Sequence, residues 1–198
     1  MSASVLIAGI GGQGTVLAAK ALSAAALLTG QNVLSAETIG MAQRGGSVVS
    51  HVRLGENIYS PLVPKGGADL MIAFDASEAV RASDYLNDKS IVVVNNLVVQ
   101  PVSASLKGIV FSAANMIEAL KKRTKNVFVV DSSEPLKKIG SPKALNMLLL
   151  GAALLKGRSI SVLPKLDDTL LALKGLVKPD FIEMNEKALR YFAAEKEN

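Results

Sequence analysis

The 198-residue chain contains no cysteine and no tryptophan, and its only histidine is His51. The lack of cysteine excludes disulfides, thiolate zinc sites, cysteine-ligated iron–sulfur clusters and a cysteine nucleophile in this chain. A single histidine excludes metal sites built from several imidazoles. Aromatic residues make up only 4% of the chain, which is poor material for stacking on nucleic-acid bases. A thiolate or multi-histidine metal site, or an iron–sulfur cluster, would therefore need another chain, and this chain is poorly suited to stacking on nucleic-acid bases.

Long apolar runs are also missing. Residues 5–8 form a short apolar run that glycines interrupt at once, and no positively charged segment precedes it. The longest nearly apolar stretch, residues 144–155, contains Asn146 and Gly151 and is too short to span a bilayer. We therefore expect a cytoplasmic protein without a targeting or membrane segment, in which residues 144–155 form a buried helix.

Charge is unevenly distributed, although the net charge is only +5. Residues 1–120 carry 7 basic and 8 acidic side chains, whereas residues 121–198 carry 15 and 9. The densest cluster is Lys121-Lys122-Arg123-Thr124-Lys125. It either complements the carboxyl end of a helix or belongs to a docking surface for an acidic partner. Interspersed acids and scarce aromatics argue against nucleic acid as that partner.

Short apolar strands alternate with helical segments along the chain. Strands are expected over 4–8, 32–36, 47–54, 68–75, 90–94, 108–111 and 126–130, and helices over 14–28, 77–86 and 141–156, after residue 112, and from Pro164 and Pro179. Residues 58–60 are expected to return against 47–54 as a hairpin. Because most strands are wholly apolar, we expect an α/β fold. It would be a doubly wound, mostly parallel, Rossmann-like sheet with an inserted β-hairpin and a helical C-terminus, in one domain of residues 1–198.

The strongest local signal is Gly9-Ile10-Gly11-Gly12-Gln13-Gly14, which directly follows a strand and opens a helix. This G-x-G-x-x-G spacing permits a tight turn and a close approach of a ligand to the backbone. The helix N-terminus then offers free N–H groups to a phosphate or carboxylate. Glu37 ends the second strand, where an acid that binds a ribose would lie. The pattern indicates a nicotinamide- or flavin-binding oxidoreductase, or else glycines required only for helix–strand packing.

A second glycine-rich segment, Gly40-Met41-Ala42-Gln43-Arg44-Gly45-Gly46, places a Gln-Arg pair between glycines. Arginine suits bidentate binding of a carboxylate or phosphate, or a subunit contact, and a plain surface loop is the alternative. His51 is either structural or a group that titrates near neutral pH. In a parallel sheet, Asp75, Asn95 and Asp131 would meet at one edge, as ligand contacts or as helix caps.

Together, the two glycine motifs resemble those of the gamma subunit, or gamma domain, of 2-oxoacid:ferredoxin oxidoreductases. The similarity continues over residues 47–53 and includes Asn146-Met147 ahead of Leu150-Gly151-Ala152. The Met-Ala-Gln-Arg-Gly-Gly form is most similar to the indolepyruvate branch of the family. The resemblance implies a small subunit of a hetero-oligomer that decarboxylates a 2-oxo acid oxidatively to an acyl-CoA and passes two electrons to ferredoxin.

The resemblance also implies a division of cofactors among chains. Thiamine diphosphate and the [4Fe–4S] clusters are expected in larger partner subunits, with ferredoxin as electron acceptor, and no cofactor is expected to bind firmly to this chain. Neither nucleic acid nor a membrane is an expected partner. Coenzyme A is a candidate ligand at the subunit interface, held by Gly9, Gly11, Gly12, Gln13, Gly14, Gln43, Arg44, Gly45 and Gly46. No residue of this chain is expected to act as a catalytic acid, base or nucleophile.

Overall fold

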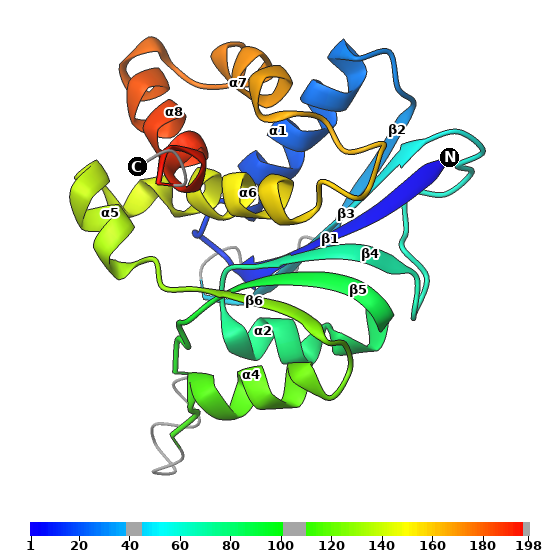
Figure 1. The fold of residues 1–198 in the computed structure, drawn as a ribbon, viewed down its shortest axis with the longest axis vertical. Helices are drawn as coiled ribbons and strands as arrows, with labels where there is room; N and C mark the ends of the chain where they lie inside the picture. The colour runs from blue at the N-terminus through cyan, green and yellow to red at the C-terminus, as the bar shows by residue number, and fades with distance from the viewer. Residues whose placement is uncertain (39–44, 101–109, 196–198) are drawn as a thin grey trace.

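A computed structural model describes residues 1–38, 45–100 and 110–195. Its centre is a six-stranded sheet with the strand order β2-β3-β1-β4-β5-β6 (Figure 1). The strands are β1 (Ser2–Ile10), β2 (Val33–Thr38), β3 (Ser47–Gly55), β4 (Ala68–Ala73), β5 (Leu86–Asn95) and β6 (Asn126–Val130). Strands β1, β4, β5 and β6 are parallel, while β3 is antiparallel to both β1 and β2. All strands except β3 therefore end at the same edge of the sheet.

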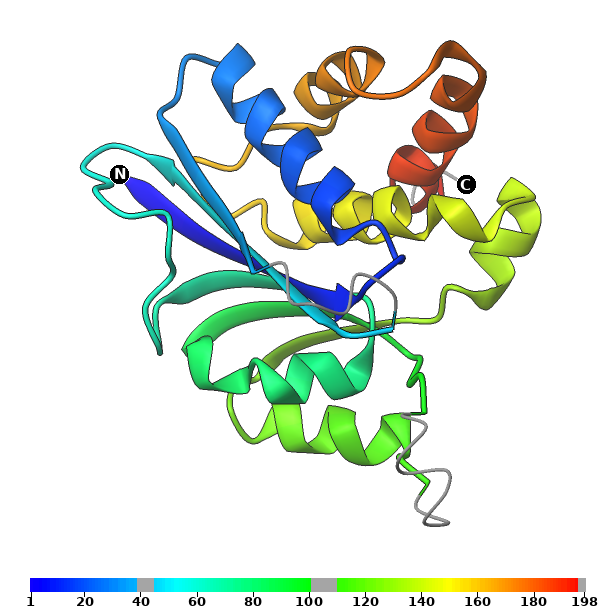
Figure 2. The same cartoon turned by 180° about the vertical axis from the view of Figure 1, so that it is seen from behind.

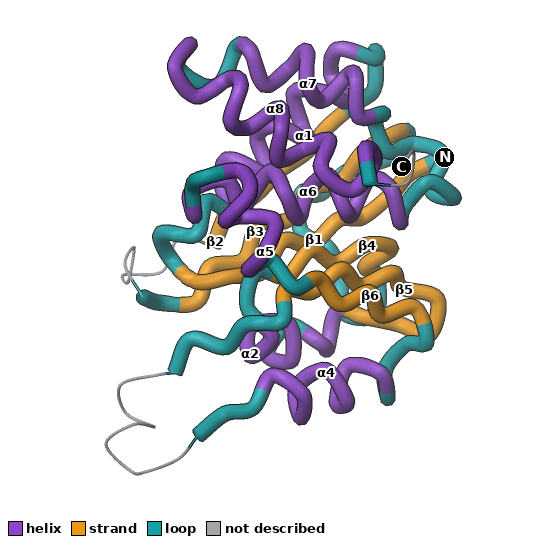
Figure 3. Tube along the Cα trace, turned by 60° about the vertical axis from the view of Figure 1, so that its left-hand side comes forward, coloured by secondary structure: helices purple, strands orange, loops and turns teal. Residues whose placement is uncertain are grey.

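Helices cover both faces of the sheet (Figures 1 and 3). They are α1 (Thr15–Leu28), α2 (Ala76–Arg81), α4 (Ala113–Lys121), α5 (Ser133–Ile139), α6 (Leu145–Lys156), α7 (Leu166–Lys174) and α8 (Pro179–Ala194), with short 3-10 helices η1 (Ser83–Tyr85) and η2 (Pro142–Ala144). Helices α2 and α4 lie on one face, and α1 lies with α6, α7 and α8 on the other. Seen from behind, α1 runs over the β1–β3 side of the sheet down to the end of β1 (Figure 2).

Alternate side chains of β1 enter two different hydrophobic cores. Val5 and Ile7 pack with residues of α1, α6, α7 and α8, whereas Leu6 and Ala8 pack with residues of α2 and α4. All four side chains are fully buried, which explains why this strand is a continuous apolar run. Helix α6 lies between the sheet and α8, and almost all of its residues are buried. The sequence prediction of a buried helix in this region is confirmed.

The expected α/β fold, with a mostly parallel sheet and a helical C-terminal part, is confirmed. The predicted hairpin partner is wrong, because residues 58–60 form no strand. Strand β3 pairs with β1 on one side and β2 on the other, so neither of its edges is open to a returning segment. The antiparallel pair inserted into the βα pattern is instead β2 with β3.

One further strand prediction is wrong, and one helix was not predicted. The strand expected over 108–111 is absent at Val110 and Phe111, the part of that segment that the structure describes. Val110 is 81% exposed, so its apolar character does not reflect burial in the sheet. Helix α5 was not expected from the sequence. It is only seven residues long and contains Pro135, a residue that occurs both in first helical turns and in loops. None of the helices in the described ranges is both long and apolar enough to cross a bilayer.

Candidate functional site

The glycine turn, residues 9–14, connects β1 to α1 at the carboxyl edge of the sheet. Gly9 still belongs to the strand, and a Cβ added there would lie 2.8 Å from the side chain of Thr15. Gly12 and Gly14 have φ angles of +103° and +84°, a left-handed conformation that favours glycine. The turn therefore needs its glycines for backbone conformation and for helix–strand packing, whatever it binds.

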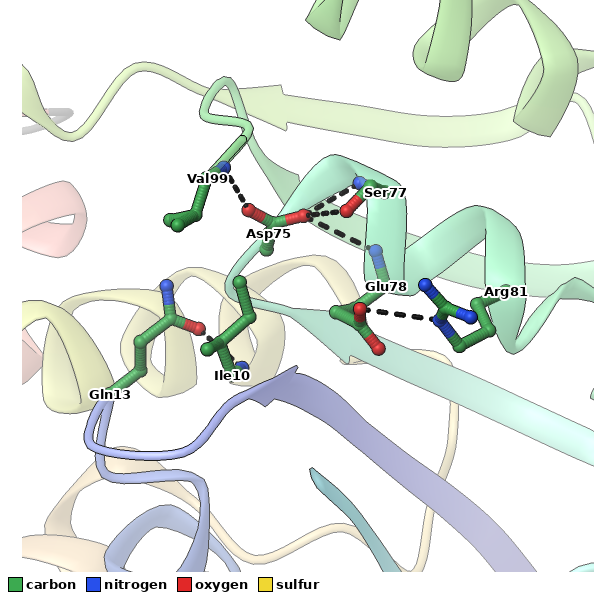
Figure 4. A network of polar contacts seen from close by, with 7 residues as sticks. All are labelled: Ile10, Gln13, Asp75, Ser77, Glu78, Arg81 and Val99. Atoms are coloured by element: carbon green, nitrogen blue, oxygen red, sulfur yellow. Dashed lines mark hydrogen bonds and ion pairs between the residues drawn. The ribbon is translucent and has the colours of Figure 1, made fainter. Parts of the chain in front are cut away.

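Gln13 stabilises the turn from within. The side-chain Oε1 of Gln13 accepts a hydrogen bond from the backbone N–H of Ile10 at 2.8 Å (Figure 4). The backbone N–H of Gln13 donates to the carbonyl of Ile10 at 3.1 Å. The N–H groups of Gly12, Gly14 and residues 15–17 have no hydrogen-bond partner among the described residues. Helix α1 also has no side-chain cap and no acidic residue in its first turn. This helix end thus keeps donors and a partial positive charge for an anion.

The second glycine motif lies directly against the first. The N–H of Gly11 donates to the carbonyl of Gly46 at 2.8 Å, and the N–H of Gly45 donates to the carbonyl of Gly11 at 3.3 Å. These bonds continue the antiparallel β1–β3 ladder beyond its last pair. The structure thus brings together five of the predicted residues with Gly45 and Gly46. Gln43 and Arg44 lie outside the described residues, and their roles stay predictions.

Asp75, at the end of β4, is a completely buried helix cap. One carboxylate oxygen accepts the N–H groups of Ser77 and Glu78 at 2.8 and 3.2 Å, at the start of α2. The other oxygen accepts the N–H of Val99 at 2.6 Å (Figure 4). Both oxygens are therefore occupied by the backbone, which supports the capping interpretation of this residue.

The other polar strand ends also bond locally. The Nδ2 of buried Asn95 donates to the carbonyl of Phe74 at 3.2 Å. Asp131 accepts the N–H of Ser133 at 2.9 Å, beside the start of α5, and this hydrogen bond lowers the pKa of the Asp131 carboxyl. Like Asp75, these side chains shape the edge of the sheet and its loops.

His51 has a structural role in the middle of β3. Its side chain is buried, and its Nδ1 accepts the backbone N–H of Val63 at 3.1 Å. The ring packs edge-on against Tyr85, with 5.4 Å between the ring centroids. Burial lowers the pKa of the imidazole, so His51 is held as a neutral hydrogen-bond acceptor. It ties the segment after β3 to the sheet.

Two cavities flank the glycine turn. One, of about 500 Å³, is lined by Lys20 and Glu37 together with glycines of the turn. Glu37 therefore lines the same cavity as the turn, and the sequence placed a ribose-binding acid at this position. However, β3 separates β2 from β1, which places Glu37 about 4.8 Å, one strand spacing, farther from the turn than in a sheet where β1 and β2 are neighbours. This strand order disfavours a dinucleotide that spans the turn and the acid.

The other cavity, of about 630 Å³, lies where α1, α6 and α8 begin. Its walls include Lys143, Asn146, Lys178 and Asn185, which the sequence did not single out as a site. These residues come from two segments of the chain, the start of η2–α6 and the start of α8. The only sequence signal was Asn146, which breaks an otherwise apolar helix.

A model of the pyruvate ferredoxin/flavodoxin oxidoreductase family matches residues 4–194 of the chain. The chain belongs to this family. Within the pyruvate ferredoxin/flavodoxin oxidoreductase family, it is 36% identical over 191 residues to the indolepyruvate oxidoreductase subunit IorB of Archaeoglobus fulgidus. That alignment covers 96% of this chain and 93% of the relative. The resemblance carried by the two glycine motifs is therefore confirmed, and the nicotinamide- or flavin-binding alternative is not favoured.

Solved structures share the fold of this pyruvate ferredoxin/flavodoxin oxidoreductase family member. The pyruvate oxidoreductase subunit PORC of Thermotoga maritima matches with a TM-score of 0.68 at 22% identity, over 96% of this chain and 94% of that one. The 2-oxoglutarate:ferredoxin oxidoreductase of Magnetococcus marinus, solved with 2-oxoglutarate, coenzyme A and succinyl-CoA bound, matches with a TM-score of 0.69 at 18% identity. It covers 98% of this chain, which corresponds to 30% of the larger chain.

One buried carboxylate of this oxidoreductase family member was missed at the sequence level. Glu78, in the first turn of α2, is only 6% exposed. Its Oε1 accepts the Nε of Arg81 at 3.3 Å, while its buried Oε2 has no hydrogen-bond partner among the described residues (Figure 4). No spacing pattern marks it in the sequence. Within the described ranges, no group of three or more His, Cys, Asp or Glu side chains could hold a metal ion.

Proposed function

We propose that this chain is the small, gamma-type subunit of a 2-oxoacid:ferredoxin oxidoreductase, with residues 1–198 acting as one domain. The family match over residues 4–194 carries the proposal. The complex oxidatively decarboxylates a 2-oxo acid to an acyl-CoA and transfers two electrons to ferredoxin. This chain contributes a rigid edge made from the glycine turn and the paired Gly45 and Gly46. It is inactive alone, and its location in the cell is the cytoplasm.

The redox cofactors are assigned to larger partner subunits. A [4Fe–4S] cluster needs cysteine ligands, and this chain has none. The described residues likewise offer no cluster of metal-binding side chains. Thiamine diphosphate supplies the chemistry of decarboxylation, and we assign it to the same partners. The role left for this chain is to assemble the complex and to position a substrate at the interface.

Coenzyme A is the substrate that we assign to the glycine edge. The free N–H groups of Gly12 and Gly14, at a helix end without acidic residues, suit a phosphate group. Gln43 and Arg44 directly precede Gly45 of this edge in the sequence, and an arginine can donate two parallel hydrogen bonds to phosphate oxygens. The solved Magnetococcus oxidoreductase, which shares this fold, contains bound coenzyme A.

The 2-oxo acid that we favour is an aryl pyruvate. The supporting observation is the 36% identity to a subunit of indolepyruvate oxidoreductase over nearly the whole chain. The assembled complex should reduce ferredoxin faster with indolepyruvate or phenylpyruvate than with pyruvate at equal concentration. Faster turnover of pyruvate would contradict the aryl assignment and leave the subunit assignment intact.

The subunit assignment is tested by reconstitution. Three preparations are compared: this chain alone, the larger subunit that co-purifies with it from the native source, and the two combined. Ferredoxin reduction with a 2-oxo acid and coenzyme A should occur at full rate only when both are present. If this chain alone oxidises a 2-oxo acid, or if it binds no larger subunit, the proposal is wrong.

The coenzyme A assignment is tested with Arg44→Gln in the reconstituted complex. Loss of the two charged hydrogen bonds from the guanidinium to a phosphate should raise the KM for coenzyme A about tenfold, with little change in kcat. The matched control is Arg123→Gln, because Arg123 pairs with Asp84 at 3.5 Å at the opposite edge of the sheet. An unchanged KM in Arg44→Gln would remove Arg44 from coenzyme A binding.

A further inference from the structure

Three helices begin around one cavity beside the glycine turn, which we call the three-helix cavity; its volume is about 630 Å³. Helices α1, α6 and α8 have 14, 12 and 16 residues, and neither α1 nor α8 is capped by a side-chain hydrogen bond at its start. Helix α6 continues from η2, which Ser141 caps. Each helix start carries a positive partial charge of roughly half a unit. Helices α1 and α6 have no acidic residue in the first turn, whereas α8 has Asp180 there. The cavity therefore has a positive potential.

Asn146 lies on the wall of this cavity and is only 5% exposed. Its Oδ1 accepts the N–H of Met147 at 2.8 Å. Its Nδ2 lies beside Gly14, where it would be 2.5 Å from an added Cβ, and it has no hydrogen-bond acceptor among the described residues. Unlike the fully buried Oε2 of Glu78, this Nδ2 keeps some exposure. An acceptor that enters the cavity would therefore reach the donor and complete its hydrogen bonding.

Further polar groups define what the cavity can accept. Asn185 is 3% exposed, and its Nδ2 donates to the carbonyl of Phe181 at 2.8 Å, which leaves its Oδ1 without a partner among the described residues. Lys143 and Lys178 are exposed residues on the same wall. All residues that form the described wall are neutral or basic. The wall thus offers two cations, an unpaired donor and an unpaired acceptor.

The rest of the wall is apolar. Phe181 and Met184 on α8 face Leu17 and Leu145, and Phe181 is 43% exposed. A bare inorganic anion would leave these side chains in water. An apolar group on the ligand would cover them and gain the hydrophobic stabilisation of that burial.

We propose that the three-helix cavity binds an organic anion, in which a carboxylate or phosphate group is attached to an apolar body. The anionic group accepts from the Nδ2 of Asn146 at the start of α1, and Lys143 and Lys178 attract it. The apolar body packs on Phe181 and Met184. The cavity shares Gly12, Gln13 and Gly14 with the edge that we assign to coenzyme A. The proposal is tested on the isolated chain with small probes, so its failure can be distinguished from a failure of the proposed function.

Calorimetry with four probes tests the ligand class. The probes are 3-phenylpropionate, phenyl phosphate, the neutral 3-phenylpropan-1-ol and inorganic phosphate. At least one aryl anion should bind about tenfold more tightly than both the alcohol and inorganic phosphate, and the preferred aryl anion identifies the head group. Equal binding of the alcohol, equal binding of inorganic phosphate, or no binding of either aryl anion at millimolar concentration would overturn the proposal.

Variants of the wall test the location. Asn146→Asp places a like charge beside the bound anion and should weaken binding of the preferred aryl anion at least tenfold. The double variant Lys143→Gln, Lys178→Gln changes only exposed residues and should weaken binding of the same anion by a similar factor. If Asn146→Asp does not fold, this double variant tests the location instead. The control Lys187→Gln removes an α8 lysine that pairs with Glu183 at 2.7 Å and should bind normally. Unchanged affinity in the folded double variant would place the anion elsewhere.

Discussion

Most buried polar side chains of this protein hold backbone segments in place. Asp75 joins the start of α2 to the segment after β5, and His51 joins β3 to the segment before β4. Each accepts backbone N–H groups that would otherwise be buried without a partner. Single substitutions at these positions should therefore change stability more than chemistry.

Asp75→Asn should lower the free energy of unfolding by about 2 kcal/mol. The amide keeps one acceptor oxygen, but its NH₂ group then faces a backbone N–H, and hydrogen bonds to charged groups contribute about 1.5–3 kcal/mol. Urea unfolding measures the change. Asp88→Asn is the control, because Asp88 is exposed, and it should stay close to wild type. Equal stability of the two variants would show that Asp75 is not an important cap.

His51 should make the protein less stable in mild acid. Burial lowers the pKa of folded His51 below 6.5, so the unfolded chain binds more protons as the pH falls below that value. Its stabilising contribution is present above pH 6.5 and is lost as the pH falls toward the folded pKa. Unfolding in urea at pH 8, 6 and 5 should show a smaller pH dependence in His51→Gln than in wild type. Identical pH profiles would contradict the burial of a neutral imidazole.

At the scale of elements, the crossing of α6 and α8 determines how the C-terminal helices pack. Gly151 lies on α6 at this crossing, and a Cβ added to it would overlap with the backbone oxygen of Leu189 on α8. The close approach buries every residue of α6 except Lys156. It also places the start of α8 beside that of α6, which forms the three-helix cavity.

Gly151→Ala should destabilise the protein by about 3 kcal/mol, although alanine is the better helix former by about 1 kcal/mol. The reason is that α8 must shift away from α6 to admit the methyl group. Thermal and urea unfolding measure the effect. Gly175→Ala is the control, because the nearest atom to its added Cβ is 3.6 Å away, and we expect a change below about 0.5 kcal/mol. A neutral Gly151→Ala would mean that the helices are not in close contact.

At the scale of the whole molecule, the strand order distinguishes this sheet from that of a dinucleotide-binding domain. The antiparallel strand β3 lies between β1 and β2 and joins the second glycine motif to the first. The basic cluster at 121–125 lies at the other edge of the sheet, where Lys121 pairs with Glu118 and Arg123 with Asp84. The two edges of the molecule therefore differ in character, and the glycine edge is the one that we assign to the complex.

The isolated chain should not bind NAD(H), NADP(H) or FAD in calorimetry, because Glu37 and the glycine turn are separated by an extra strand. Glu37→Ala should leave the titrations unchanged. Tight binding of NAD that Glu37→Ala abolishes would instead restore the nicotinamide interpretation. Glu56→Ala serves as the control for an exposed acid, since Glu56 pairs only with the N-terminal amine among the described residues.

The sequence by itself determined the α/β class, most strand and helix positions and the two glycine motifs. These features depend on local pattern: residues 5–8 are apolar because they are buried on both faces, and Gly12 and Gly14 need a left-handed backbone. The tertiary structure decided the partners of β3, because its alternating pattern suits any antiparallel neighbour. It also decided that Asp75 is a cap, and that Asn146 lies beside Gly14. Asp75 bonds to Val99, and Asn146 lies beside Gly14, because elements far apart in the chain pack together, and no local pattern records that packing.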